Sequence, residues 1–498
     1  MSLSVRSRVR VRRVCLSLLS IALVGTEAPG QLVTPKTVPV HQGQQFDLFP
    51  SQRPGMGGVN IAVNDTLFDP FVNPARATRL TRGYFFANPY SHSVTGGRGG
   101  GRTVPVGGLF TAGKWSGTAL VALQQLDRAG PSWNLPISEQ TASNSYVEAS
   151  LARRLSGGLS LGAAAYYAGL GAVDGVDLLY AGSDRIQQDG HLVDLRLGLT
   201  KDFSGQRTLD AVLVHNRTSV VHDVHYSLWR WVGPGQPPDF FEREEHNEDH
   251  TNIWGVHARY AYPLGSEGWR IGFVGTANRL SHPKIPNYDV QNIPRDPGNT
   301  SAFNAGVGVA RTIGGFVAGV DVLYEPMFAD TWATAERDTA IVVGGTIRAG
   351  ERTVDNTFRF NNARMRMGVS QEIPLKADSS SALGLQAGLG AYAIRYRLKQ
   401  YNHVQRSYRT QDEDWVEWSP SLGVKYRSHN VELQYTWYRT CGAIGCSDGQ
   451  SGGQLVLPPM AAGIATSAGG IIAAPGAPLT LDGGVVSVHR ITVTLPIR

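Results

Sequence analysis

The sequence predicts an all-β fold, a single transmembrane antiparallel β-barrel of about 16 strands that follows an irregular N-terminal segment. Three observations predict it: segments with alternating apolar and polar residues, connections that alternate between short and long, and no apolar run long enough for a membrane helix. The alternation is clearest in Asp414 to Arg427 and in Asn430 to Arg439. A period of two is the strand period, and its recurrence along the whole chain is typical of membrane barrels.

Residues 1–30 have the features of a secretory signal peptide. Five arginines between Arg6 and Arg13 precede the short apolar stretch Val14 to Val24, and small residues follow at Ala28 to Gly30. We expect export and not an N-terminal membrane anchor, because about eleven apolar residues are too few to span a bilayer. Cleavage would remove five positive charges and Glu27, so the formal charge of +6 would fall to about +2. The basic composition therefore does not indicate a nucleic-acid partner.

Two cysteines would remain after export, Cys441 and Cys446, in a glycine-rich stretch. Exported thiols usually oxidise, so we expect a local disulfide between them. A pair of free thiols, or half of a metal site, are the alternatives.

Residues 31–79 do not have a strand pattern, because prolines recur throughout them. We expect an irregular segment with at most one short helix. The barrel is expected to occupy residues 80–498, with no linker that would divide it into smaller domains.

About 16 strand candidates follow one another, each long enough to cross a bilayer when tilted. They are Thr81–Asn88, Thr103–Ala112, Trp115–Leu126, Ser145–Leu155, Leu159–Leu170, Gly190–Phe203, Thr208–Val221, Thr251–Tyr262, Trp269–Leu280, Ser301–Ile313, Phe316–Ala329, Asn356–Ile373, Ala382–Lys399, Asp414–Arg427, Asn430–Arg439 and Val485–Ile497.

The connections between these candidates alternate in length. Short turns are expected at residues 113–114, 156–158, 204–207, 263–268, 314–315, 374–381 and 428–429. Longer polar or Gly/Pro-rich loops are expected at residues 89–102, 171–189, 222–250, 330–355 and 441–484. Outer-membrane barrels have short periplasmic turns and long outer loops, and an even strand count puts both termini in the periplasm. An array of soluble β-sandwiches is the alternative, but it gives no reason for this alternation.

The period of two also assigns faces. Leucines and a valine that share the outward face are Leu195, Leu197, Leu199, Leu383, Leu385, Leu389, Val431 and Leu433. The inward, lumen-facing candidates are Asp194, Arg196, Asn362, Arg364, Arg366, Glu372, Gln386, Glu417, Lys425, Arg427, Glu432 and Gln434. Charges of both signs cannot face lipid without a large cost, so we expect them in the lumen. Two interpretations stay open: they pair with one another, or they contribute to selectivity.

Aromatic residues lie near both kinds of connection, as the two interfacial girdles of a membrane barrel require. Those near short turns are Trp115, Phe203, Tyr262, Trp269 and Phe316, and those near long loops are Tyr166, Trp254, Trp415 and Trp437. A general preference of aromatic residues for strands is the alternative explanation.

Enzymatic motifs are not convincing in this sequence. Two Gly-x-Ser-x-Gly matches, at Gly158 to Gly162 and Gly445 to Gly449, are expected by chance in a chain with 59 glycines. Ser160 lies in a predicted strand and not at a strand-to-helix turn. We therefore expect no enzyme and no cofactor.

Histidines and carboxylates gather at the two ends of the loop predicted at residues 222–250. They are His222, Asp223, His225, Glu244, Glu245, His246, Asp249 and His250. No helical His-x-x-x-His spacing accompanies them, so we expect a solvated acidic loop and no metal site.

The residues before the first strand resemble the N-terminal stretch of the long-chain fatty acid outer-membrane transporter superfamily, which includes barrel proteins of type IX secretion. The similarity lies in Gly57 to Val59, Ala62 to Asp65 and Phe71 to Ala75, which ends in the turn Asn73-Pro74-Ala75. The resemblance implies that residues 31–79 plug or gate the lumen. It also implies a barrel of 14 strands, two fewer than the pattern suggests.

Two positions depart from that family. Arg76 follows the Asn-Pro-Ala turn, where the relatives usually have Gly, and the chain ends in Arg498 and not in an aromatic residue. No further motif aligns, so the family's ligand-binding residues cannot be assigned.

The sequence thus predicts a protein of the bacterial outer membrane whose partners are lipid and the barrel-assembly machinery. The first functional hypothesis is a channel or transporter for small molecules, with hydrophobic solutes included. The second is a non-transporting scaffold, or a component of a secretion complex, that presents its long loops to a partner protein.

Overall fold

The computed structural model of the protein describes residues 47–94, 100–129, 139–172, 185–230, 239–265, 267–281, 298–335, 338–341, 344–376, 381–440 and 485–497. The predicted signal peptide and both cysteines of the predicted disulfide lie outside these ranges. Within them, no helix has the length and hydropathy needed to cross a membrane.

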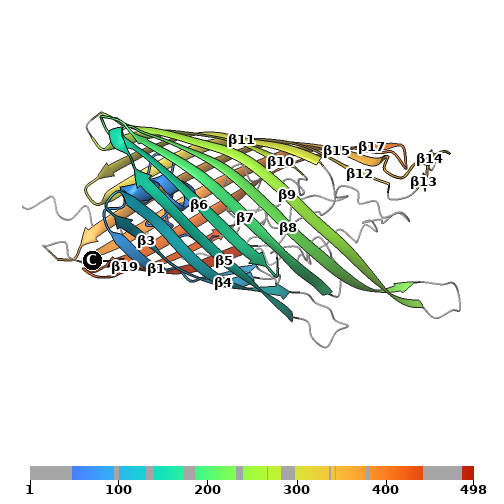
Figure 1. Ribbon diagram of the computed structural model, residues 1–498, viewed down its shortest axis with the longest axis horizontal. Helices are drawn as coiled ribbons and strands as arrows, with labels where there is room; N and C mark the ends of the chain where they lie inside the picture. The colour runs from blue at the N-terminus through green and yellow to red at the C-terminus, as the bar shows by residue number, and fades with distance from the viewer. Residues whose placement is uncertain are drawn as a thin grey trace, which may run out of the picture.

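Within the described residues, an antiparallel sheet of 17 strands forms the wall of the molecule and closes on itself (Figure 1). Neighbours in sequence are neighbours in space, and β19 closes the ring by pairing with both β1 and β2. Because β1 and β2 share one position between β19 and β3, the wall has 16 strand positions. The predicted barrel of about 16 strands is confirmed, and the 14 strands implied by the family resemblance are not found.

The strands are long, as the bounds show. They are β1 Gly83–Ala87, β2 Tyr90–Val94, β3 Gly100–Ala112, β4 Trp115–Ala129, β5 Glu139–Arg154, β6 Leu159–Leu170, β7 Arg185–Asp202, β8 Thr208–Arg230, β9 Asp239–Leu264, β10 Trp269–Ser281, β11 Gly298–Ile313, β12 Phe316–Thr334, β15 Arg352–Pro374, β16 Ala382–Asn402, β17 Ser407–Arg427, β18 Glu432–Thr440 and β19 Val486–Ile497. A separate two-stranded hairpin, β13 Thr339–Ala340 with β14 Thr346–Ile347, lies between β12 and β15.

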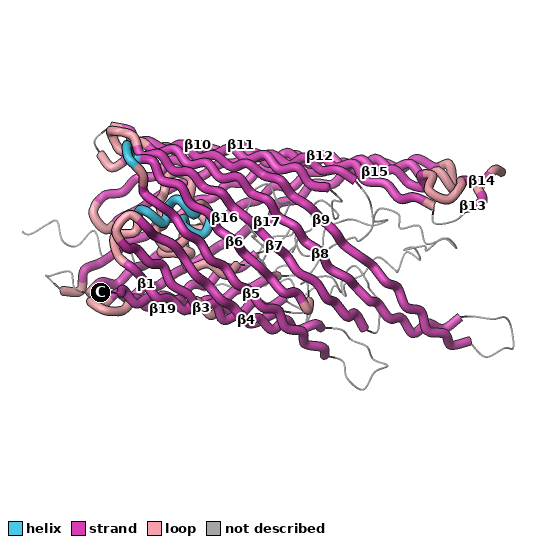
Figure 2. The backbone as a smooth tube through the Cα atoms, viewed as in Figure 1, coloured by secondary structure: helices cyan, strands magenta, loops and turns pink. Residues whose placement is uncertain are grey.

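The short turns predicted from the sequence lie at one end of the barrel, whereas at the other end β16 and β17 are joined by a turn of residues 403–406. Glycines with positive φ allow the tightest of the predicted turns, at Gly113 (φ 61°) and Gly314 (φ 57°). The end with these turns also holds the start of the first strand and the end of the last, because Gly83 pairs with Ile497. We call it the short-turn end (left in Figures 1 and 2) and the other the long-loop end.

Several expectations about strand bounds were wrong. The hairpin of β8 and β9 remains paired out to Arg230 and Asp239, so residues 222–230 and 239–250 are strand and not loop. Residues 242–250 of β9 are polar on both faces, so the apolar alternation that marks a strand in the sequence is lost there while the backbone pairing continues. In addition, the loop predicted at residues 89–102 contains β2 and the first residues of β3. Pro89, which has no N–H for the ladder, separates β1 from β2.

The barrel exterior carries an apolar belt. On β16 each outward position from Leu383 to Ala393 is apolar, and Leu385 is 43% exposed. Eleven residues tilted by about 40° rise about 25 Å, the height of the lipid-facing band of membrane barrels. Exposed aromatic side chains border the belt near the short turns, among them Trp115 and Trp269, and Trp254 lies nearer the long loops.

One residue assigned to the girdles lies elsewhere. Tyr166 is 6% exposed and faces inward, where its ring lies 6.3 Å from that of Tyr146. Its neighbour Tyr167 faces outward and is 48% exposed. Adjacent residues of a strand point to opposite faces, so the sequence alone did not show which of the two tyrosines faces outward.

Candidate functional site in the barrel lumen

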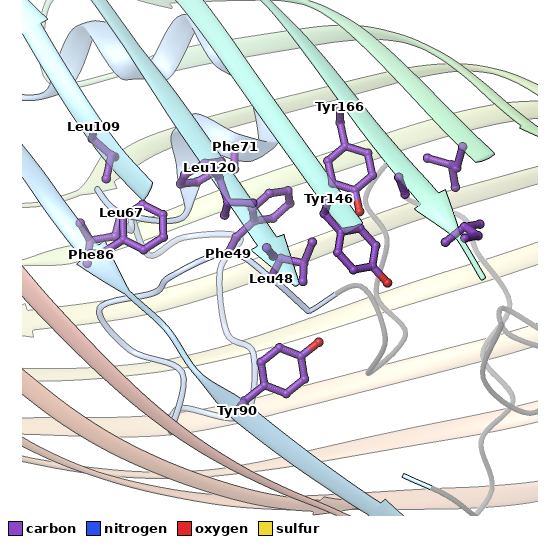
Figure 3. Packing of buried hydrophobic residues seen from close by; sticks show 14 of the residues in the cluster. Leu48, Phe49, Leu67, Phe71, Phe86, Tyr90, Leu109, Leu120, Tyr146 and Tyr166 are labelled. Carbon is purple, nitrogen blue, oxygen red and sulfur yellow. The ribbon is translucent and has the colours of Figure 1, made fainter. Parts of the chain in front are cut away.

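Residues 47–80, the inner segment, lie inside the ring of strands near the short-turn end (Figure 2). The segment contains one helical turn, α2 Asp69–Val72, and a 3₁₀ helix, Pro74–Arg79, that contacts β5, β6 and β7. Its Phe49 and Phe71 rings are stacked 4.7 Å apart, and wall residues such as Phe86 and Tyr166 pack around them (Figure 3). The short helix expected in residues 31–79 is present, but most of the segment is irregular.

The Asn73-Pro74-Ala75 turn fixes the segment to β7. The Asn73 side-chain oxygen accepts a hydrogen bond from the Ala75 main-chain N–H (3.1 Å), and Pro74 starts the 3₁₀ helix where no N–H is required. The Asn73 amide donates to the Leu199 carbonyl at 3.1 Å. One asparagine therefore caps the helix and binds the wall.

Glycines on the inner wall allow the segment to approach this closely. A Cβ atom at any of seven positions would come within 2.1–2.7 Å of an atom of the inner segment. These glycines, which we call the glycine track, are Gly162, Gly198, Gly272, Gly308, Gly319, Gly368 and Gly388. They lie on β6, β7, β10, β11, β12, β15 and β16, so the segment follows the wall around much of the lumen.

Arginines of the wall satisfy main-chain carbonyls that no secondary structure satisfies. Arg196 donates to the Phe71 carbonyl (2.9 Å), Arg259 to the Ile61 carbonyl (2.8 Å), and Arg366 to the Gly58 carbonyl (3.2 Å). Arg154 and Arg490 donate in the same way to the carbonyls of residues 78 and 47. Buried carbonyls without a partner are costly, so these contacts hold an irregular chain inside the barrel.

Acceptors of the wall satisfy the segment's N–H groups. One oxygen of Asp321 accepts from the N–H groups of Asn60 (2.8 Å) and Ile61 (3.1 Å). The Gln386 side chain makes two hydrogen bonds to the segment. Its oxygen accepts from the Gly55 N–H (3.0 Å), and its amide donates to the Gln52 carbonyl (2.9 Å). The wall and the segment therefore complement each other in donors and acceptors, and not only in shape.

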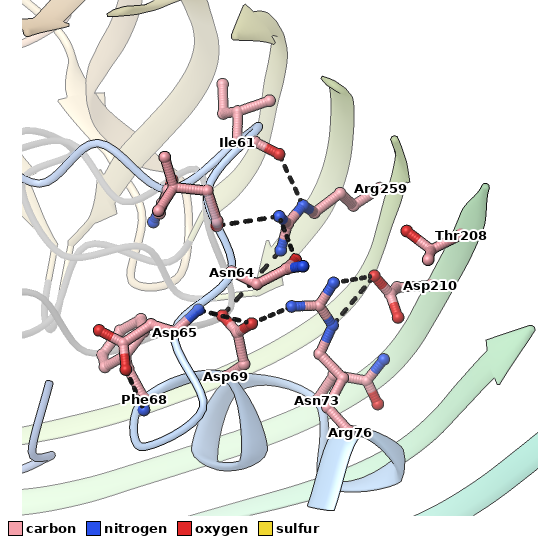
Figure 4. Close-up of polar contacts among 12 residues, drawn as sticks. Ile61, Asn64, Asp65, Phe68, Asp69, Asn73, Arg76, Thr208, Asp210 and Arg259 are labelled. Carbon is pink, nitrogen blue, oxygen red and sulfur yellow. Dashed lines mark hydrogen bonds and ion pairs between the residues drawn. The ribbon is translucent and has the colours of Figure 1, made fainter. Parts of the chain in front are cut away.

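Arg76 forms the most buried ion pair between the segment and the wall. Its Nη2 lies 2.7 Å from the Asp210 carboxylate on β8, and its Nη1 binds Asp69 within the segment (Figure 4). Burial alone would lower the pKa of Arg76, but the two carboxylates outweigh it and raise the pKa above its ordinary value. A cavity of about 80 Å³ lies beside this pair, against Asp69, His257 and Arg259.

A second carboxylate organises the segment itself. Asp65 accepts from the Ser51 hydroxyl (2.6 Å) with one oxygen and from the Leu67 N–H (3.0 Å) with the other. Burial raises the pKa of Asp65, and the nearby Asp69 adds to the effect. Asp65 thus joins two parts of the segment that are far apart in sequence.

The residues predicted to face the lumen form three groups. Asp194 binds Arg196 at 2.7 Å beside α2, and Arg366 meets the segment at Gly58. Lys425 lies 2.7 Å from Glu372 near the short turns, with Arg427 and Glu432 beside them.

The third group lies on the long-loop side of the segment. Arg364 is 3.6 Å from Glu325 and stacks over the Tyr392 ring, and the Asn362 amide donates to the Tyr392 hydroxyl (3.3 Å). Glu417 is buried at 4% exposure. All three groups therefore contain charged or polar side chains buried against one another or against the inner segment.

Several contact residues were missed in the sequence, among them Arg154, Asp210, Arg259, Asp321 and Arg490. Each of the last four is a single charge among apolar or small residues on the inward face of its strand, which was the available signal. Their partners could not be identified from the sequence, because the contacts span up to 443 residues along the chain.

Apolar side chains form two buried clusters on the inward face on the long-loop side of the segment, beside buried polar residues such as Asn216, Asn304 and Asn356. On β12, β15 and β16 they form one buried cluster, which contains Met327, Phe358, Phe360, Tyr392, Ile394 and Leu398. On β4 to β8 a second cluster extends from the inner segment toward the long-loop end and includes Leu192, Val220 and Val224.

The histidines predicted to lie in an acidic loop lie on the paired ends of β8 and β9. His246 Nδ1 is 2.6 Å from Asp223, and His250 contacts Glu248 at 3.2 Å. In the part of the chain that the structure describes, no group of three or more His, Cys, Asp or Glu side chains could hold a metal ion.

No family model and no curated protein matches this chain. Several solved structures do match it. A Pseudomonas aeruginosa FadL homologue matches with a TM-score of 0.42 and 11% identity, covering 90% of this chain and 99% of its own. The Pseudomonas putida toluene transporter TodX gives a TM-score of 0.38 at 11% identity, covering 95% of this chain and 99% of its own. The ferric-catecholate import receptor Fiu of E. coli K12 gives 0.34 at 8% identity, covering 83% and 81%.

The chain resembles FadL-family transporters. The likeness is one of fold alone. The arguments about the lumen that follow rest on the side chains of this chain alone.

Proposed function

We propose that this protein is an outer-membrane channel or transporter for small apolar molecules. The observation that carries the proposal is the buried apolar cluster of Phe358, Phe360 and Ile394 with its neighbours on the inward face. Water-filled barrels line their interior with polar side chains. An apolar cluster on the inner wall favours solutes that partition away from water.

The exterior supports the membrane location. Leu197, Leu385 and Leu433 are 61%, 43% and 47% exposed and belong to a continuous belt. Exposing so much apolar surface to water is unfavourable, whereas lipid would cover it. The short-turn end, where the first strand starts and the last strand ends, would face the periplasm.

The inner segment is the proposed gate. Its fit to the glycine track and its contacts with Arg196, Arg259 and Asp321 support a role in closing the lumen at the short-turn end. The inward charges then hold the segment and do not select the solute. Solute would pass when part of the segment detaches from the wall.

Conductance in planar bilayers tests the gate. We expect the mature protein to conduct little and a variant without residues 31–79 to open large, stable channels. Equal conductance of both proteins would remove the gate from the proposal. Because the deletion could impair folding, a heat-resistant band in SDS gels must be present for both.

Uptake assays test the solute class. Phe360→Ser changes an interior side chain with 0% exposure, and Phe303→Ser changes an exterior one with 41% exposure. We expect the interior change to lower the uptake of a fluorescent fatty-acid analogue into proteoliposomes, while the exterior change has little effect. Rapid swelling with a sugar, and no uptake of the analogue, would identify a polar pore instead.

One observation favours the alternative, a scaffold. The β8 and β9 hairpin continues beyond the apolar belt, from about Asn252 to Asp239 on β9, and offers a rigid projecting surface (Figure 1). A membrane that remains silent with and without residues 31–79, together with no solute uptake, would favour this function.

A further inference from the structure

A basic pocket opens on the outside of the barrel wall, away from the lumen. It has a volume of about 540 Å³. We call it the exterior basic pocket, and its lining residues are Thr357, Arg359, Asn361, Arg395, Arg397, Lys399 and Asp412. They lie on β15, β16 and β17.

The outward direction of these side chains follows from the strand alternation. Arg395, Arg397 and Lys399 share the face of Leu385, which is 43% exposed, and the intervening Ile394 and Leu398 are 1% exposed. Arg359 likewise alternates with the buried Phe358 and Phe360. The pocket is therefore separate from the proposed path of the solute.

The pocket begins where the apolar belt ends. Outward positions on β16 are apolar up to Ala393, and Arg395 is the next one. On β17 the change occurs between Val416 and Asp414. With lipid chains against the belt, the pocket is level with the lipid headgroups on the long-loop side.

Its positive charge is only partly neutralised. Arg359 lies directly opposite Arg397 across the strand pair, an unfavourable arrangement of like charges. Each has one carboxylate partner, Asp330 at 3.3 Å and Asp412 at 2.6 Å.

Within the described residues, neither Arg395 nor Lys399 forms an ion pair of 4.0 Å or less. Arg395 lies directly opposite the outward-facing Asp414 on β17, whereas Lys399 lies opposite Thr410 and contributes most of the uncompensated charge. A bound anion would supply the missing charge and relieve the repulsion between the arginines.

We propose that this pocket binds the phosphate groups of a phosphorylated glycolipid in the outer leaflet, with the acyl chains against the belt below. The volume suits a phosphorylated sugar headgroup, and guanidinium groups bind phosphate through paired hydrogen bonds. This inference depends on the outer-membrane orientation of the proposed function, which puts the long-loop end outside. It does not depend on whether any solute is transported.

Lipid retention by the detergent-purified, folded full-length protein tests the site, measured by native mass spectrometry. The probes are diphosphorylated lipid A, its dephosphorylated form and phosphatidylglycerol. We expect the protein to retain only the diphosphorylated lipid A strongly. Equal retention of the dephosphorylated form, or of phosphatidylglycerol, would overturn the proposal.

Matched variants locate the effect. Arg395→Gln with Lys399→Gln removes the two unpaired cations, and we expect at least a tenfold loss of lipid A retention. Arg217→Gln with Arg279→Gln removes two other outward cations, on β8 and β10, and is expected to change retention less than twofold. A similar loss in both variants would indicate general attraction to basic surfaces and would overturn the site.

The same preparations separate this inference from the transport proposal. Lipid A retention in a protein that takes up no solute would contradict transport alone. Uptake of the fatty-acid analogue by a protein with no lipid preference would contradict the exterior basic pocket alone.

Discussion

Arg76 and Asp210 form a 2.7 Å ion pair between the inner segment and strand β8, and the side chain of each is 3% exposed. The pair is the most buried charged contact between the segment and the wall among those the structure describes. A buried charge that loses its partner is costly, so the pair strongly favours the docked segment.

Asp210→Asn should therefore loosen the inner segment while the barrel remains folded. We expect the free energy of docking to fall by about 3 kcal/mol, at the lower end of the range for a broken buried pair because Asp69 still contacts Arg76. The measurement is the urea concentration at which trypsin begins to cut within residues 47–80.

Asp202→Asn is the matched control. It breaks the pair of Arg79 with Asp202, whose side chains are 24% and 49% exposed, and exposed pairs contribute only about 0–1 kcal/mol. Equal sensitivity of the two variants to trypsin would contradict the importance of the buried pair.

Arg76 also illustrates what the sequence could predict. The resemblance around Asn73 to Ala75 indicated a turn at a luminal segment, but at Arg76 it indicated only a departure from the family. The structure gives that arginine a partner on β8, 134 residues away in sequence. Strand periodicity is local and was predictable, whereas a contact between an irregular segment and a distant strand has no local signal.

The inward face of the barrel was also predictable only in part. Alternation was sufficient to select Asp194, Arg196 and Arg366 as inward residues, because a strand has only two faces. It did not select the glycine track, since a glycine contributes no side chain to the pattern. The projecting end of β9 was missed for the opposite reason, because residues 242–250 are polar on both faces.

The glycine track predicts a sharp steric effect. At Gly388 a Cβ atom would lie 2.1 Å from the Gly57 nitrogen, so Gly388→Ala must push the segment away from β16. We expect faster proteolysis of the segment and, in bilayers, frequent opening events.

Gly390→Ala is a close control, on the same strand and face. There the nearest atom is 3.4 Å away, in the Ser419 side chain, and the Gly57 carbonyl oxygen is 4.0 Å away. This variant should behave as the wild type. If Gly388→Ala also behaves so, the segment is not held against the track.

The apolar belt predicts that a charge introduced on the outward face lowers the free energy of unfolding more when it lies nearer the middle of the membrane. Leu197 is 61% exposed near the middle of the belt on β7, so Leu197→Arg should lower the free energy of unfolding by about 2–4 kcal/mol. Gln187→Arg, on the same strand and face but nearer the long-loop end, should cost about 1 kcal/mol or less. Urea titration of the protein in lipid vesicles measures both, and equal costs would contradict the position of the belt.

The β8 and β9 hairpin predicts a pH-dependent contact beyond the belt. The hydrogen bond to Asp223 raises the pKa of His246 above its ordinary value of 6.5, with a further contribution from Glu248. A raised pKa in the folded state means that the protonated imidazole stabilises the hairpin. That contribution is fully present below about pH 6.5 and is lost as the pH rises through the folded-state value. NMR titration of labelled histidine measures the pKa directly. Asp223→Asn should lower the pKa of His246 toward 6.5, and an unchanged titration curve would show that Asp223 does not control it.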